Sequence, residues 1–71
     1  MENNCGCKLH EYFKRNIGRK MKIECYLNNR YHIIYGVLFE VGDNYIVLKK
    51  KQPLSTIMCD VSSIVIATVI Y

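Results

Sequence analysis

The stretch "YGVLFEVGDNYIVLKKK", residues 35–51, decides how the fold is read. Gly36 interrupts an apolar run, and a glycine inside a strand usually marks a bend, a bulge or a close approach of another backbone. Residues 42–44 (GDN) then form a turn signal, and a second run rich in β-branched residues follows it. The stretch therefore predicts two strands of a small β domain, the first of them bent at Gly36.

The residues before this hairpin predict a helix and a strand. Between Lys8 and Ile17 the apolar side chains recur with helical spacing, and Gly18 stands where a C-terminal helix cap belongs. Residues 20–27 (KMKIECYL) then alternate between apolar and polar, which is typical of a half-buried strand. Cys25 falls on its apolar side and is expected in the core.

Across the chain, the pattern predicts a helix followed by five short strands, with asparagine-rich residues 28–30 as a turn and residues 61–63 as a brief break. That order predicts a mainly β fold, in which a strongly bent antiparallel sheet closes into a barrel. The strands are expected at residues 20–27, 31–41, 45–50, 55–60 and 64–71. We expect a single domain over residues 1–71, with residues 1–7 flexible, a helix at 8–17 and the barrel at 20–71.

The length and the apolar content indicate self-association. A chain of 71 residues has room for one small core and usually needs support from disulfides, metal or oligomerisation. Its last strand, "IVIATVIY" (residues 64–71), is almost continuously apolar, and an apolar edge strand must be paired. Pairing edge to edge closes into a ring of identical subunits. The candidate interface residues are Ile57, Ile64, Ile66 and Val69.

The charge is uneven along the chain. The net charge is +4, and the segment up to Lys22 already carries six basic residues against two acidic ones, whereas the remainder is balanced. A basic segment of this kind attracts phosphate, but it is also typical of a solvated helix face. Both interpretations remain open from charge alone.

The order of elements and the residues around Gly36 resemble the Sm-like family, and among its members the Hfq-like bacterial RNA chaperones. Gly36, Leu38 and Val41 match the glycine and the two apolar positions of the family's bent second strand. Residues 43–45 look like its Asp-Asn-aromatic turn, displaced by one residue because Gly42 is extra. The resemblance covers residues 9–69 and also extends to small Sm-like proteins of spore-forming bacteria whose role is not established.

The resemblance implies an SH3-like barrel, a homo-oligomeric ring and single-stranded RNA as a partner. Tyr45 would stack on a base and Asn44 would donate hydrogen bonds, and a basic rim would contact the RNA backbone. The alternative is that Tyr45 is an ordinary strand aromatic and that the rim is a solvated face. The residues that the resemblance places in RNA binding are Asp43, Asn44, Tyr45, Lys14, Arg15, Arg19 and Lys20. Residues 49–51 (KKK) are read as a lysine cluster that blunts a sheet edge.

The departures from the family affect the pore. Hfq-like proteins carry Tyr-Lys-His there, whereas this chain has Met58, Cys59 and Asp60 at the corresponding positions. A ring of Asp60 carboxylates repels a phosphate backbone, so RNA is not expected in the pore. The Arg-Gly of archaeal and eukaryotic Sm proteins is also missing. Cys59 is read either as a pore residue or as a core residue.

The sequence gives little support for other chemistry. Cys5, Cys7 and His10 supply only three ligands, and their spacing is tighter than is usual for zinc, so no metal or other cofactor is expected. No catalytic constellation or phosphate-binding glycine loop is present, and we predict neither an enzyme nor a small-molecule substrate.

Two functional hypotheses therefore remain. One is an RNA-binding Sm-like ring, and the other is a structural or protein-interaction ring, associated with spores, that has no role with nucleic acid. The start of the sequence has no signal-peptide pattern, and no apolar run approaches the roughly 18 residues that span a bilayer. We expect a cytoplasmic protein without a membrane partner.

Overall fold

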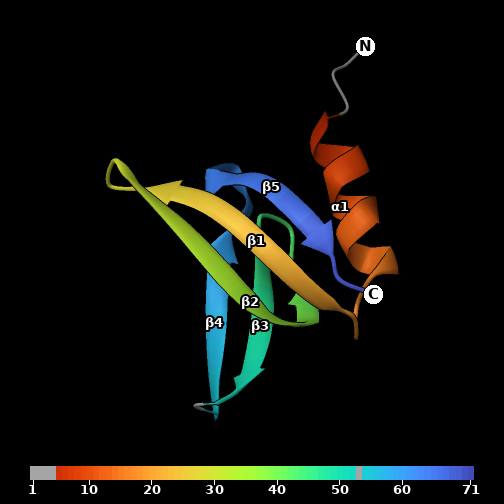
Figure 1. Ribbon diagram of the computed structural model, residues 1–71. Helices are drawn as coiled ribbons and strands as arrows, with labels where there is room; N and C mark the ends of the chain where they lie inside the picture. Colours follow the sequence, from red (N-terminus) through yellow and green to blue (C-terminus); the bar gives the residue numbers. More distant parts are fainter. Residues whose placement is uncertain (1–4, 53) are drawn as a thin grey trace.

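The structure is a computed structural model that describes residues 5–52 and 54–71, with side chains from Lys8 onward. Figure 1 shows a helix, α1, beside a bent sheet. The described residues form α1 (Cys5–Arg15), β1 (Lys20–Leu27), β2 (Arg30–Val41), β3 (Tyr45–Lys51), β4 (Leu54–Asp60), a 3₁₀ turn η1 (Val61–Ser63) and β5 (Ile64–Val69). The predicted helix, the five strands and the break between the last two are confirmed.

Within the described chain the strands form one antiparallel sheet in the order β4-β3-β2-β1-β5. β3 and β4 run at a steep angle to β1, so the sheet is strongly bent (Figure 1). It is not closed, because β4 and β5 are its two edges and do not pair with each other. η1 carries the chain from the β4 edge to the β1 edge, and each edge strand keeps one unpaired side. The prediction is confirmed as a bent antiparallel sheet, but not as a closed barrel.

The helix differs from its predicted bounds of 8–17. It begins at Cys5, so part of the segment predicted to be flexible is helical, and residues 1–4 lie outside the described residues. It ends at Arg15 because the Asn16 N–H donates to the Phe13 carbonyl (2.9 Å) and the Asn16 side chain donates to the Tyr12 carbonyl (2.7 Å). These bonds satisfy carbonyls that a helix end otherwise leaves unpaired. Gly18, with φ of +94°, then turns the chain toward the sheet.

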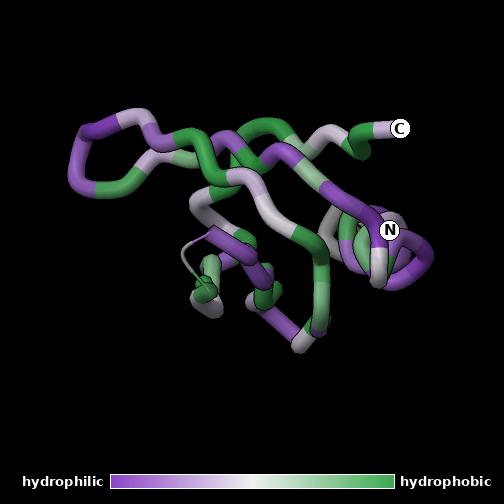
Figure 2. The backbone as a smooth tube through the Cα atoms, turned by 60° about the horizontal axis from the view of Figure 1, so that its bottom comes forward, coloured by the Kyte–Doolittle hydropathy of each residue, from purple (hydrophilic) through white to green (hydrophobic). Residues whose placement is uncertain are grey.

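The core lies between α1 and the concave side of the sheet. α1 contributes Phe13, and the alternation along β1 buries Met21, Ile23 and Cys25, as the sequence predicts. The other strands complete the buried set with Leu38, Ile46, Val47, Leu48 and Cys59. Figure 2 shows hydrophilic segments at the β1–β2 hairpin tip and along α1, with hydrophobic segments along the strands between them. Apolar burial of this kind is the main favourable contribution to folding.

At Gly36 the backbone of β3 lies close to β2. A Cβ atom at this position would stand 3.0 Å from the Lys49 carbonyl oxygen and 3.2 Å from the Leu48 Cβ atom. Two residues further on, the pairing of β2 with β3 shifts at a bulge between Leu38 and Glu40. The predicted close approach is therefore present, and the bulge adds to the bend.

The β1–β2 turn follows the expected chemistry of asparagine. Asn28 and Asn29 have φ of 53° and 61°, in the left-handed region that two-residue hairpin turns require. Of the helices in the described residues, none has the length and apolar composition needed to cross a membrane.

Replacing Gly36 by alanine is expected to destabilise the protein by about 1–3 kcal/mol, the usual cost of overpacking. The added methyl group would press on the Lys49 backbone, which the pairing with β2 and β4 holds in place. Urea denaturation followed by circular dichroism measures the change. A variant that unfolds at the same urea concentration as the wild type would show that β3 can move away from β2 freely.

Candidate nucleic-acid interface

The predicted basic rim lies where α1 passes into β1. Lys14 and Arg15 occupy the last turn of α1, where the helix dipole favours positive charge. Arg19 and Lys20 lead into β1. Their side chains are exposed, and among the described residues none of the four pairs with a carboxylate. The Arg19 guanidinium carbon lies 5.6 Å from the centre of the Tyr71 ring, a cation–π distance. The rim therefore presents positive charge that is free to meet an anion.

The predicted Asp-Asn-aromatic turn has a different environment. Asp43 and Asn44 are exposed, and Tyr45 begins β3 with its ring directly over Gly42, where any Cβ atom would overlap it. The Tyr45 hydroxyl donates to Glu40 Oε2 at 3.0 Å. One face of the ring is therefore covered, and a carboxylate lies beside it. This packing also gives a reason for the extra glycine at position 42.

The turn and the rim lie on separate parts of the chain. Residues 43–45 connect β2 to β3, whereas the rim lies between α1 and β1. In residues 5–52 and 54–71 no hydrogen bond or ion pair joins the two groups. The four rim residues therefore form one group, and residues 43–45 are not part of it.

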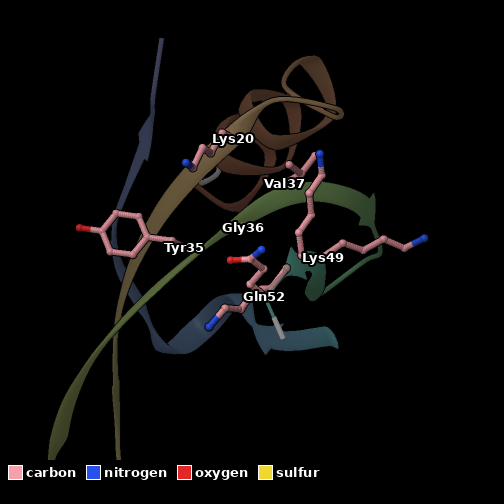
Figure 3. Close-up of a pocket in the computed structure, with 8 residues that line it drawn as sticks. Lys20, Tyr35, Gly36, Val37, Lys49 and Gln52 are labelled. Atoms are coloured by element: carbon pink, nitrogen blue, oxygen red, sulfur yellow. The ribbon is translucent and has the colours of Figure 1, made fainter. Parts of the chain in front are cut away.

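The structure also has a cavity beside Gly36 that the sequence did not predict. This cavity, which we call the lysine hollow, has a volume of about 270 Å³. Figure 3 shows Lys20 and Tyr35 to one side of Gly36, and Lys49 and Gln52 to the other. The described residues that line the hollow are Lys20, Tyr35, Gly36, Val37, Lys49, Lys50, Lys51 and Gln52, and none of them is acidic.

The strand register explains how the lysines meet. Lys20 of β1 lies opposite Val37 of β2, and Val37 in turn lies opposite Lys49 of β3. Residues opposite each other on adjacent strands share one face of the sheet, so Lys20 and Lys49 flank Val37 on the same face. Gly36 belongs to the opposite, core-facing row, since its cross-strand partner is the buried Met21.

Lysines 49–51 have a further apolar neighbourhood. The Lys49 ammonium lies 3.7 Å from the centre of the Phe39 ring, within cation–π range. A second hollow of similar volume shares Val37 and residues 49–51 and is also lined by Phe39 and Leu54. The expectation that this cluster blunts a sheet edge is wrong, because β3 is an inner strand; the lysines line these hollows instead. The sequence feature that indicates the lysine hollow is the spacing of Lys20, Val37 and Lys49. It can be recognised only when the pairing register of β1, β2 and β3 is known.

The residues at the family's pore positions have local roles. Met58 is exposed. Cys59 is buried in the core, so of its two predicted roles, pore residue or core residue, the structure shows the core residue. Burial raises the pKa of the Cys59 thiol, and the nearby Cys25 thiol raises it further. Asp60 caps η1, since its side chain accepts from the Ser62 N–H and its carbonyl accepts from the Ser63 hydroxyl.

The predicted interface residues divide between core and surface. Ile57, Ile64 and Val69 are half-buried and pack against the core of their own chain. Ile66 is 47 % exposed, and its neighbour Val65 is 58 % exposed. On the opposite edge, Met58 of β4 is 67 % exposed. Apolar side chains are therefore exposed on both edge strands of the sheet.

A metal centre is not formed within the part of the chain whose side chains are described, since no three His, Cys, Asp or Glu residues come together there. His10 is half-buried on α1, and the side chains of Cys5 and Cys7 lie outside the described set. No family model matches the chain, and no curated protein sequence matches it.

The contact between Tyr45 and Glu40 gives a pH prediction. The hydrogen bond to the Glu40 carboxylate, together with its charge, raises the pKa of Tyr45 above the ordinary value of 10.0. The stabilisation from this bond is therefore present below pH 10 and is lost as the pH rises through the raised pKa. Glu40→Gln is expected to lower the Tyr45 pKa toward its ordinary value, as measured by NMR titration with ring-labelled tyrosine. Glu11→Gln, which removes an exposed carboxylate on α1, is the control and should leave the titration of Tyr45 unchanged.

Proposed function

We propose that the protein is an Sm-like, ring-forming RNA-binding protein of the cytoplasm. The observation that carries the proposal is the accumulation of exposed cations, unpaired among the described residues, where α1 enters β1 and continuing through Lys20 into the lysine hollow. A helix followed by five strands of one bent sheet agrees with the sequence resemblance. Clustered lysines and arginines on one surface are the electrostatic footprint of nucleic-acid binding.

The ring would form by pairing of the two free edges. β4 and β5 end the sheet on opposite sides, and each offers unpaired backbone donors and acceptors. Pairing β4 of one subunit with β5 of the next would cover Met58, Val65 and Ile66. Such head-to-tail contacts close into a ring when the rotation between subunits allows it. Pairing with a neighbouring subunit on each side would leave neither edge of the sheet free.

RNA would contact the rim through its phosphates. Lys14, Arg15, Arg19 and Lys20 carry no sequence-reading geometry, so the contact would be electrostatic and weakly specific. Binding of a single strand to such a surface weakens with salt by a slope of roughly 0.7 per phosphate neutralised. The pore would take no part, because Asp60 carries the wrong charge for a phosphate.

Arg15→Glu is expected to weaken binding of a single-stranded RNA oligonucleotide about tenfold and to reduce the salt dependence, because one phosphate contact becomes a repulsion. Fluorescence anisotropy over a range of salt concentrations measures both quantities. The matched control is Arg30→Glu, which makes the same charge change at the exposed tip of the β1–β2 hairpin. Equal loss in the two variants would mean that only net charge matters and that the rim is not the contact.

The ring is tested by a lysine on the free edge. Ile66→Lys is expected to convert the oligomer into monomers at micromolar concentration, since a charged side chain on an edge strand opposes pairing. Ile33→Lys is the matched control, because Ile33 is 49 % exposed and lies in the same cross-strand row, on an inner strand. Native mass spectrometry reports the subunit number. A wild-type protein that is monomeric under these conditions would refute the ring.

A structural ring without RNA is the second candidate, and one observation favours it. Tyr31, Ile33 and Tyr35 form an exposed apolar row along β2, away from both edges, with each side chain about half exposed. Exposed apolar rows of this kind often meet another protein. A closed oligomer that binds no RNA would leave this candidate in place of the first.

A further inference from the structure

The lysine hollow combines four features that point to an anion. Four lysines, Lys20 and residues 49–51, are among its described lining residues, and the same set contains no carboxylate to neutralise them. Gln52 adds an amide that can donate hydrogen bonds. Gly36 and Val37 give an uncharged floor. The volume of about 270 Å³ is below the roughly 300–1,000 Å³ of pockets for drug-sized molecules, which suits a group as small as a phosphate or one nucleotide.

Glu24, an acidic residue of the β1–β2 strand pair, is already engaged. Glu24 of β1 lies two residues beyond Lys22, which pairs with Tyr35 across the strands. Lys22 Nζ lies 3.8 Å from Glu24 Oε2, and the Tyr31 hydroxyl donates to the same residue. Glu24 therefore has partners of its own, and it does not line the hollow.

Tyr35 supplies an aromatic surface beside these cations. It lines the hollow and is 47 % exposed, and Figure 3 shows its ring extending away from Gly36. An exposed ring beside a positive groove is the combination by which proteins hold single-stranded nucleic acid, because the ring stacks on a base while the cations hold the backbone.

We propose that the lysine hollow binds a phosphate group of a single-stranded nucleic acid and that Tyr35 stacks on the adjoining base. The inference deepens the proposed function and rests on it, since it gives the RNA a defined contact in addition to the rim. Lys20 belongs to both surfaces, so one strand can run from the rim into the hollow. Lys49, held over the Phe39 ring, has less freedom to lose when it binds the phosphate.

The test is binding of a fluorescein-labelled 12-nucleotide single-stranded RNA to the full-length protein at several salt concentrations. The double variant Lys50→Gln and Lys51→Gln is expected to bind at least tenfold more weakly, with a salt slope smaller by about 0.7. The matched control is Lys8→Gln with Arg30→Gln, which removes two exposed positive charges outside the hollow. Tyr35→Leu is expected to lose at least about fivefold, whereas Tyr35→Phe keeps the affinity.

The outcomes separate this inference from the function on which it rests. If the wild type binds RNA but the lysine double variant matches its control, the hollow is not the site and the proposed function stands. If the wild type binds no single-stranded RNA, the proposed function fails and this inference fails with it. DNA of the same sequence is expected to bind about as well, because phosphate and base are shared. Equal binding of a duplex would overturn stacking on Tyr35, since paired bases present no free face.

Discussion

The rest of the structure depends on the absence of a side chain at Gly36. β3 lies so close to β2 there that a Cβ atom at Gly36 would stand only 3.0 Å from the carbonyl oxygen of Lys49. With the bulge two residues later, this close approach turns the β3–β4 half of the sheet away from the β1–β5 half. The bent sheet therefore has a concave face and an opposite face. The concave side closes on the core with Leu38 and Leu48, and the other side opens as the lysine hollow.

A sheet bent in this way encloses a core but leaves its ends unfinished. The buried side chains come from α1 and from four strands, and β5 contributes only half-buried residues. β4 and β5 do not pair with each other, so closure within one chain does not occur. The apolar side chains on the free edges are too exposed to add much to the stability of a single chain. Burial against a second copy would recover that contribution, and it is the physical reason for preferring an oligomer.

The elements were predictable from the sequence, but the contacts between them were not. Alternation in residues 20–27 placed Cys25 inside, and the asparagines at the β1–β2 turn required the left-handed backbone that they adopt. The end of α1 was placed two residues too late, because Asn16 satisfies the helix carbonyls before Gly18 is reached. Of the candidate interface, the four rim residues could be found by counting charge. The lysine hollow could not, because a one-residue change of register would move Lys49 to the other face of β3.

The strand register also determines which surface of this chain nucleic acid would contact. The resemblance directs attention to a turn and a pore, yet Tyr45 is bonded to Glu40 and Asp60 is engaged in capping η1. Both positions place carboxylates where a phosphate would have to approach. The cations lie elsewhere, on the rim and on the face where Lys20 and Lys49 flank Val37. An electrostatic partner binds where positive charge is uncompensated, so in this chain the surface that follows β1 and β3 is a better candidate than the family's usual positions.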